Sequence, residues 1–282
     1  MSMTLKFHLL KVGHCSHPEC VTQRGGKLSA AEFPALVGLL IHPTRGPMLF
    51  DTGYSKAFYD ATQPFPERFY RWVTPFTLPS DEVLTTQLAR YGYVPEDIRH
   101  VFVSHMHADH VSGLTDFPKA TLFAMRAEVN AMRRRSRIGA LRRGFLTALL
   151  PNDFDTRVRF VEDARLFRLP VAMAPFTEGF DLLGDQSVVG VPLPGHTAGQ
   201  MGIWFYTEGE RQVFLIADAC WSIGALAQNR PPSWIANQLF ADKDGYARTF
   251  DGLRRLLSAN ENLMMIPSHC NATWERLGRD DF

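Results

Sequence analysis

Three histidines and an aspartate lie within six residues, in the run His105-Met106-His107-Ala108-Asp109-His110. Imidazole nitrogen and carboxylate oxygen are ligands that suit zinc and its neighbours. Adjacent histidines bring no benefit to a solvent-exposed loop, so a chance cluster is the weaker interpretation. The run follows the apolar stretch 100–104, which is typical of a buried strand. We therefore predict a metal site where this strand ends.

Four other residues with metal-binding or acid–base chemistry also follow short apolar stretches. Asp51, His196, Asp218 and His269 come directly after, or within three residues of, the stretches 48–50, 188–193, 212–217 and 263–266. Strand ends at one edge of a sheet bring residues that are distant in the sequence onto a rigid base. The recurrence predicts that all five segments contribute to one site.

The order of these motifs resembles that of the metallo-β-lactamase superfamily. The resemblance rests on His-x-His-x-Asp-His at 105–110, Gly195-His196-Thr197, Asp218 and His269, with Asp51-Thr52-Gly53 upstream, and it covers nearly the whole chain. It implies an α/β fold of the αββα sandwich type, in which two mixed sheets lie back to back with helices outside. It also implies one domain over residues 1–282, with the metals at one edge of the sandwich.

The resemblance further implies two divalent metal ions. One would be bound by His105, His107 and His196. The other would be bound by Asp109, His110 and His269, and Asp218 would bridge both, so that Asp109 and Asp218 count as catalytic residues. Two nearby cations need an anionic bridge, and a water shared between them loses its proton near neutral pH and becomes the nucleophile. Zinc is the default metal, and iron, manganese and cobalt fit the same ligands.

Two positions near these ligands refine the prediction. Asp51 is expected either to orient a ligand histidine without touching the metal or to cap the turn before Thr52-Gly53. His107 stands where diiron flavoproteins of the superfamily carry glutamate, which favours hydrolysis over redox chemistry. Asp218 distinguishes the chain from true β-lactamases, which lack the bridging aspartate.

Within the superfamily, the N-terminal half is most similar to the quorum-quenching N-acyl homoserine lactone lactonases. The similarity lies in Val12-Gly13-x-Cys15, in the stretch 50–53 and in the segment 91–99. It implies hydrolysis of a lactone or a carboxylic ester. Those lactonases carry a tyrosine where this chain has Trp221 and a histidine where it has Gln200. Both departures argue against an acyl homoserine lactone as the substrate more than against the lactone or ester class.

Residues 54–79 are rich in aromatic side chains and proline. We expect an excursion that binds substrate through Tyr54, Phe69 and Trp72, together with Trp221. The structural interpretation is a hydrophobic cap over the edge of the sandwich, and we favour a mixture of both roles.

Two further functions remain open. A thioester hydrolase of the glyoxalase II kind would need an anion-binding patch, and the arginine-rich stretch 126–150, expected to be one helix, is the only candidate. The alternative without a binding role is that the stretch forms a solvent-exposed helix face. A metal-bearing protein that binds a small signal without turnover is favoured only by Trp221. The Cys/His run 14–20 is expected at the rim of the site, and a separate metal site there is the weaker interpretation.

The composition of the chain limits which partners and locations remain plausible. The 282 residues carry a formal net charge of +1, which favours neither nucleic acid nor a membrane surface as a partner. No apolar run reaches the length that spans a bilayer, and no signal peptide is evident. We therefore expect a cytoplasmic protein with a small-molecule substrate and leave the oligomeric state open. The four cysteines are too few for a disulfide framework.

Overall fold

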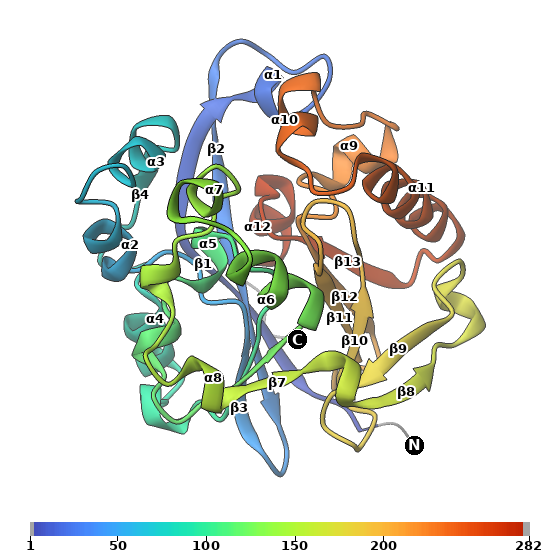
Figure 1. Cartoon of the computed structure of the whole chain (residues 1–282). Helices are drawn as coiled ribbons and strands as arrows, with labels where there is room; N and C mark the ends of the chain where they lie inside the picture. Colours follow the sequence, from blue (N-terminus) through green and yellow to red (C-terminus); the bar gives the residue numbers. More distant parts are fainter. Residues whose placement is uncertain (1–2, 279–282) are drawn as a thin grey trace.

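Two β-sheets pack face to face, and helices cover both outer faces (Figure 1). The computed structural model describes residues 3–278. The first sheet has the strand order β4 (Phe76–Thr77), β1 (Lys6–Pro18), β2 (Ala30–His42), β3 (Gly46–Phe50), β5 (His100–Phe102), β6 (Thr121–Ala124) and β7 (Val158–Phe160). The second has the order β13 (Leu263–Pro267), β12 (Gln212–Ala217), β11 (Met201–Tyr206), β10 (Val189–Pro192), β9 (Glu178–Asp181) and β8 (Arg165–Arg168).

Side chains that alternate along each strand fill two apolar layers, one between the sheets and one under the outer helices. In β12, Val213 and Leu215 point between the sheets, whereas Phe214 and Ile216 pack under the helices of the second sheet. Successive side chains of a strand point to opposite faces. Every residue of such a strand is therefore apolar when both of its faces are covered.

The helices divide between the two outer faces. The first sheet is covered by α2 (Lys56–Ala61), α3 (Arg68–Val73), α4 (Leu84–Arg90), α5 (Ala108–Val111), α6 (Arg126–Arg133), α7 (Arg137–Leu141) and α8 (Phe154–Arg157). The second is covered by α9 (Ile223–Ala227), α10 (Trp234–Leu239) and α11 (Lys243–Ala259). The short α1 (Glu19–Thr22) joins β1 to β2, and α12 (Asn271–Leu277) lies against these two strands.

Strand direction gathers the candidate ligands at one edge. β3 runs parallel to β5, and β12 runs parallel to β13. β10 is separated from β12 by β11, which is antiparallel to both, so β10 and β12 point the same way. The C-terminal ends of the strands that precede the five predicted segments therefore meet at the same end of the sandwich.

The αββα prediction is confirmed, but several element boundaries differ from expectation. The stretch 126–150 is not one helix: α6 ends at Arg133, and Ser136 begins α7 by accepting a hydrogen bond from the Gly139 amide. Ser80 before the apolar pattern that starts at Val83 predicts a helix beginning at Ser80, but the helix begins only at Leu84. The sequence over 237–257 predicts a mostly helical segment. It is divided between α10 and α11, because Asp242 caps a new helix by accepting from the Gly245 amide.

The N-terminal segment forms a long strand that was not predicted. β1 runs to Pro18, so the Cys/His run 14–20 begins within a long strand, whereas a loop was expected there. Of the predicted single unit 1–282, residues 1–2 and 279–282 lie outside the described residues, and the one-domain interpretation stays a prediction. None of the helices within residues 3–278 is both long and apolar enough to cross a bilayer.

Candidate metal centre

The seven predicted ligands meet at the end of the sandwich as two groups of side chains. His105, His107, His196 and Asp218 form one group, and Asp109, His110 and His269 form the other. The potential ligand atoms within each group all lie within 4.8 Å of one another. All are buried except His107 and Asp109, which are half-buried.

In the first group, imidazole nitrogens point at one another. His107 Nδ1 lies 3.1 Å from His105 Nε2 and 3.0 Å from His196 Nε2. Burial lowers the pKa of His196 to about 3, with nearby His107 adding to the effect against the pull of Asp218. Burial and the neighbouring imidazoles likewise hold the pKa of His105 well below its usual range. These rings are therefore neutral, with lone pairs available to a cation.

The carboxylate of Asp218 stands between the two groups. Its Oδ2 lies 3.2 Å from His196 Nε2, on the side of the first group. Its Oδ1 lies 3.1 Å from His269 Nε2 and 3.3 Å from His110 Nε2, on the side of the second. Although burial opposes ionisation, the surrounding imidazoles hold the pKa of Asp218 well below its usual range. A carboxylate with one oxygen toward each group has the geometry of a bridging ligand.

The second group also fits a cation. His110 Nε2 and Asp218 Oδ1 are buried 3.3 Å apart, yet neither makes a contact with hydrogen-bond geometry in the described part of the chain. Buried polar atoms are rarely left unpaired in native proteins, and a metal ion is one of the partners that explains such a case. Asp109 adds a carboxylate oxygen 3.5 Å from His269 Nε2. The donor set of nitrogen and carboxylate oxygen matches zinc and related metals.

The ring nitrogens that face away from the cluster are fixed by acceptors. His110 Nδ1 lies 2.8 Å from Asp51 Oδ2, and His269 Nδ1 lies 2.7 Å from the Pro34 carbonyl oxygen. The Ser104 hydroxyl donates to Asp51 at 2.7 Å and so accepts from His105 Nδ1 at 2.9 Å. An acceptor at Nδ1 keeps the proton there and leaves Nε2 free to bind metal. Of the two interpretations of Asp51, the contact with His110 supports the first.

Glu128 on α6 holds two ligand segments together and was missed in the sequence. Its carboxylate accepts from the Met106 amide at 3.1 Å and from the Gly199 amide at 2.9 Å. Its side chain is buried, and burial raises its pKa. The only signal in the sequence was a glutamate on the apolar face of an amphipathic helix, four residues before Met132 in the apolar pattern.

Gly195 lets the segment that carries His196 pass close to α11. Its φ is +133°, and a Cβ there would lie 2.2 Å from the backbone nitrogen of Tyr246. Only glycine has both the conformational freedom and the small size that this position needs.

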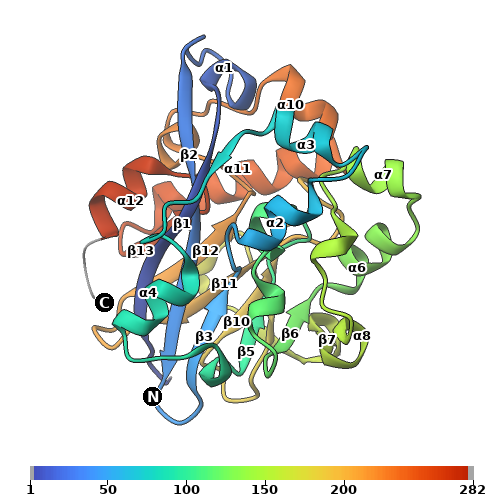
Figure 2. The ribbon, with the colours of Figure 1, turned by 90° about the vertical axis from the view of Figure 1, so that its left-hand side faces the viewer.

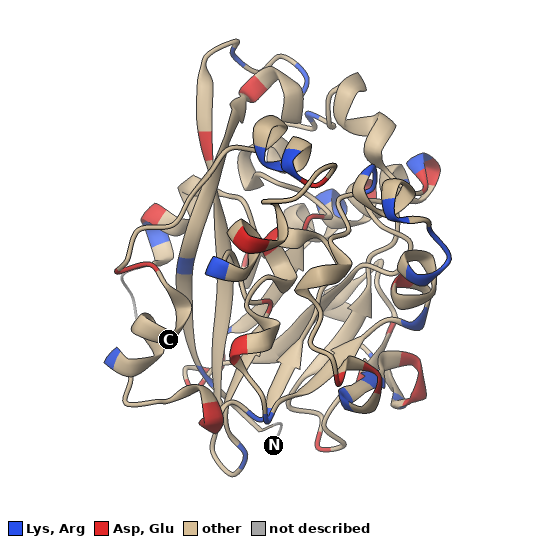
Figure 3. Cartoon of the chain, turned by 60° about the vertical axis from the view of Figure 1, so that its left-hand side comes forward, with Lys and Arg blue, Asp and Glu red and all other residues tan. Residues whose placement is uncertain are grey.

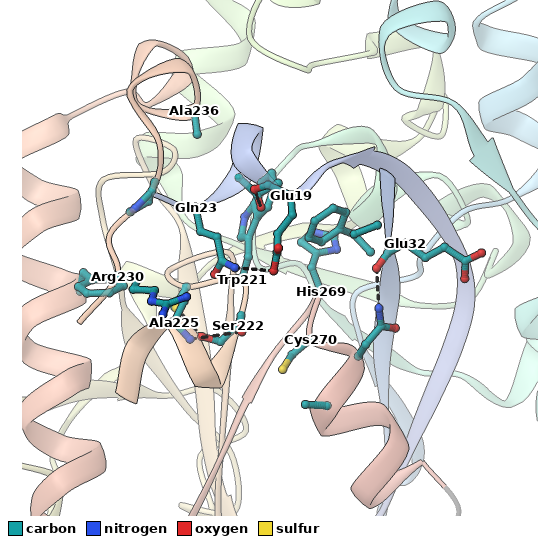
Figure 4. Close-up of a pocket in the computed structure, with 18 of the residues that line it drawn as sticks. Glu19, Gln23, Glu32, Trp221, Ser222, Ala225, Arg230, Ala236, His269 and Cys270 are labelled. Atoms are coloured by element: carbon teal, nitrogen blue, oxygen red, sulfur yellow. Dashed lines mark hydrogen bonds between the residues drawn. The ribbon is translucent and has the colours of Figure 1, made fainter. Parts of the chain in front are cut away.

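Trp221 borders both the cluster and a cavity. Its Nε1 donates to Asp218 Oδ2 at 3.0 Å, and its ring centroid lies 5.4 Å from that of His269. The cavity has a volume of about 170 Å³, and Phe33, Phe240 and Ala236 line it together with Trp221. Figure 4 shows Trp221 and Ala236 at this cavity. Its outer rim carries polar side chains, among them Glu32 and Arg230.

The other predicted substrate residues lie apart from this cavity. Tyr54 is only 2% exposed and packs between Phe58 and Phe76 in the core. Phe69 and Trp72 are exposed on α3, in edge-to-face contact with each other. None of Tyr54, Phe69 and Trp72 lines the cavity beside Trp221, so their role in substrate binding stays a prediction.

The arginine-rich stretch is engaged in internal contacts. Arg137 pairs with Glu67 near α3, and Arg143 donates to the carbonyl oxygens of Leu239 and Phe240. Arg133 pairs with Asp155. The stretch therefore connects α6 and α7 to neighbouring segments. Basic and acidic residues are interspersed along the ribbon (Figure 3).

Comparisons with known proteins agree with this geometry. The model of the metallo-beta-lactamase superfamily matches residues 32–216. A probable metallo-hydrolase of Mycobacterium tuberculosis is 28% identical over 249 residues, which cover 82% of this chain and 73% of that protein. An N-acyl homoserine lactonase of Bacillus cereus is 27% identical over 187 residues, 65% of this chain and 63% of that protein.

Solved structures extend the likeness to the whole fold. An N-acyl homoserine lactone hydrolase with N-hexanoyl-L-homoserine bound at its catalytic metal centre superimposes with a TM-score of 0.75 over the full length of both chains, at 17% identity. The dizinc quorum-quenching lactonase AidC gives a TM-score of 0.66 at 15% identity and covers 96% of this chain and 90% of its own. At these identities the likeness concerns the fold alone.

Proposed function

The chain is a metal-dependent hydrolase that belongs to the metallo-β-lactamase superfamily, and we propose that it binds two divalent metal ions and opens a lactone or a carboxylic ester. The observation that carries the proposal is the position of Asp218, with one carboxylate oxygen toward each group of ligands. A site for a single metal would not need an anion facing both ways. The lactonase relatives support the substrate class.

We assign the ligands as the two groups divide. His105, His107 and His196 bind one metal, Asp109, His110 and His269 bind the other, and Asp218 bridges them. When bound, the metals lower the pKa of water to near neutrality and polarise the substrate carbonyl. Zinc fits the donors best, and iron, manganese and cobalt fit them as well.

The protein itself contributes orientation and a binding surface. Asp51 and Ser104 keep protons on the Nδ1 atoms of His110 and His105. Trp221 holds the Asp218 carboxylate through its indole N–H. Indole donates one hydrogen bond and cannot relay a proton as a phenol can, so Trp221 orients the site and takes no part in proton transfer.

The cavity beside Trp221 is suited to the apolar part of the substrate. Phe33, Phe240 and Ala236 give it apolar walls, and its volume of about 170 Å³ suits a ring or a short acyl chain. The scissile carbonyl would then lie at the end where His269 and Trp221 meet the ligands.

Metal content and hydrolysis measured together test the proposal. Elemental analysis should give about two metals per chain. A panel of acyl homoserine lactones, aromatic lactones, aryl esters and glutathione thioesters should show turnover of lactones or esters. No metal in protein prepared without chelator would refute the metal centre. Two metals without turnover would favour a protein that binds a small signal.

Two further results separate the substrate classes. Preferred turnover of the glutathione thioester would favour the glyoxalase II-like alternative, although Arg133, Arg137 and Arg143 are already paired within the protein. Trp221→Tyr should raise lactone turnover if a phenol at this position polarises the carbonyl. Unchanged turnover in that variant would argue against a modified lactonase.

A further inference from the structure

A second groove lies on the outer side of the excursion, away from the candidate metal centre. It is formed by α2, α3 and the segment 75–83 that includes β4, on the side of the molecule that faces the viewer in Figure 2. Its volume is about 870 Å³, and none of the seven candidate ligands lines it. The groove is therefore a feature separate from the hydrolytic site.

Arg71 gives this groove a positively charged side chain. Its guanidinium group lies 4.4 Å from the centre of the Tyr59 ring. Its Nη1 atom is buried and has no hydrogen-bond partner within residues 3–278. A buried donor of a charged group is costly to leave unpaired. An acceptor in the groove would remove this cost once the Arg71 side chain turns so that Nη1 faces the groove.

The other charges around the groove determine which anion it favours. The ammonium group of Lys56 is paired with Asp60 at 2.6 Å. Asp116 lines the groove and would repel an incoming anion. Arg71 therefore supplies one uncompensated positive charge with a carboxylate nearby. This balance favours a monoanion over a dianion such as a phosphate monoester.

The remaining walls are apolar. Trp72, Phe76 and Leu78 line the groove next to Arg71, and the Trp72 side chain is 62% exposed. Exposed aromatic side chains beside a polar anchor are typical of sites that bind an apolar body with one charged end. The planar guanidinium fork matches the geometry of a carboxylate.

We propose that this groove binds a small amphipathic carboxylate. The carboxylate accepts hydrogen bonds from Arg71, and its apolar part lies against Trp72, Phe76 and Leu78. Binding needs neither the metals nor the cavity beside Trp221, so the proposal does not depend on the proposed function.

Calorimetric titration of the full-length protein with octanoate tests this site. Arg71→Gln should weaken octanoate binding at least tenfold, because the charged donor is lost. Arg134→Gln is the matched control: it removes one positive charge at an exposed position on another segment and should leave the affinity unchanged. Octanamide, which has the same chain and no charge, should bind at least tenfold more weakly than octanoate.

A variant that should bind octanoate more tightly is also needed, because misfolding could explain a loss of binding but not a gain. Asp116→Asn removes the repelling carboxylate and should tighten octanoate binding severalfold. It should tighten binding of octyl phosphate by a larger factor, because a dianion is repelled more strongly.

Four outcomes would overturn the proposal. The first is no heat of octanoate binding at millimolar concentration, which would mean that water alone occupies the groove. The second is octanoate binding that Arg71→Gln leaves unchanged, as expected if octanoate binds only at the metal centre. The third is equal binding of octanamide and octanoate. The fourth is tighter binding of octyl phosphate than of octanoate in the unmodified protein.

Discussion

Asp51→Asn would isolate the role of one buried carboxylate behind the ligands. Asp51 is 1% exposed and accepts three hydrogen bonds: from the Ser104 amide at 2.7 Å, from the Ser104 hydroxyl at 2.7 Å and from His110 Nδ1 at 2.8 Å. Its φ is +62°, in the left-handed region. Asparagine tolerates this region as well as aspartate does. The variant therefore keeps the backbone and the volume and removes only the charge and half of the acceptor capacity.

The size of the effect follows from these bonds. A hydrogen bond to a charged group contributes about 1.5–3 kcal/mol and a neutral one about 0.5–1.5 kcal/mol. Weakening three bonds and turning one amide N–H toward a former donor should lower the free energy of unfolding of the metal-free protein by about 2–4 kcal/mol. Loss of a residue that orients a metal ligand typically weakens metal binding by about 10–100-fold.

The loss should fall mainly on one metal. His110 belongs to the group with Asp109 and His269, and it bonds Asp51 directly. His105, in the other group, reaches Asp51 only through the Ser104 hydroxyl. After dialysis against a weak chelator, elemental analysis should show one metal largely lost and the other largely kept.

Asp181→Asn is the matched control for this experiment. Asp181 is also a buried aspartate, and it accepts from the amides of Gly184 and Gln186, distant from the ligands. Chemical denaturation should show both variants to be less stable, but only Asp51→Asn should lose metal. The reasoning is refuted if Asp51→Asn keeps both metals with unchanged affinity, or if Asp181→Asn loses as much metal.

Three further predictions concern single side chains. Asp218→Asn should lower both metal retention and turnover, because the bridge loses its charge; full metal content with full activity would rule out the bridge. Trp221→Phe keeps the ring but removes the N–H donor to Asp218 Oδ2, so metal affinity measured by chelator competition should fall by about tenfold, and an unchanged affinity would show that the indole bond does not orient the carboxylate. Burial, with nearby Arg45, lowers the pKa of His100 from 6.5 to about 4, so the unfolded chain binds a proton that the folded chain excludes, and stability falls as the pH drops from about 6.5 toward 4. After allowance for solvent screening of the partly exposed ring the loss is about 1–2 kcal/mol, and denaturation at several pH values should show a smaller acid loss in His100→Gln.

The candidate site could be predicted because each part of it is encoded by a short, continuous stretch of sequence. Each ligand segment is a short apolar strand followed by a polar residue of a metal-binding type, as in 100–110 and 212–218. Strand direction then brings these polar residues together, since parallel neighbours such as β12 and β13 end at the same edge. The contact between Asp51 and His110 needed only that β3 and β5 lie side by side.

Features that depend on contacts between distant segments could not be predicted in the same way. Glu128 looks like any helical glutamate until the segments of Met106 and Gly199 are seen to converge on it. The arginine-rich stretch has helix-forming composition throughout, yet it breaks at Ser136, whose hydroxyl caps a new helix. Intrinsic propensity is a weak signal, and capping and tertiary contacts override it.

Trp221 links the metal ligands to the choice of substrate. The same side chain donates to the Asp218 carboxylate and forms a wall of the cavity. A substrate group that presses on the indole ring would therefore also move the donor of a bridging ligand. Phenylalanine removes the hydrogen bond and keeps most of the wall, whereas tyrosine shortens the wall and adds a hydroxyl. If metal affinity falls in the phenylalanine variant while the substrate preference changes mainly in the tyrosine variant, the two roles of this side chain are separable.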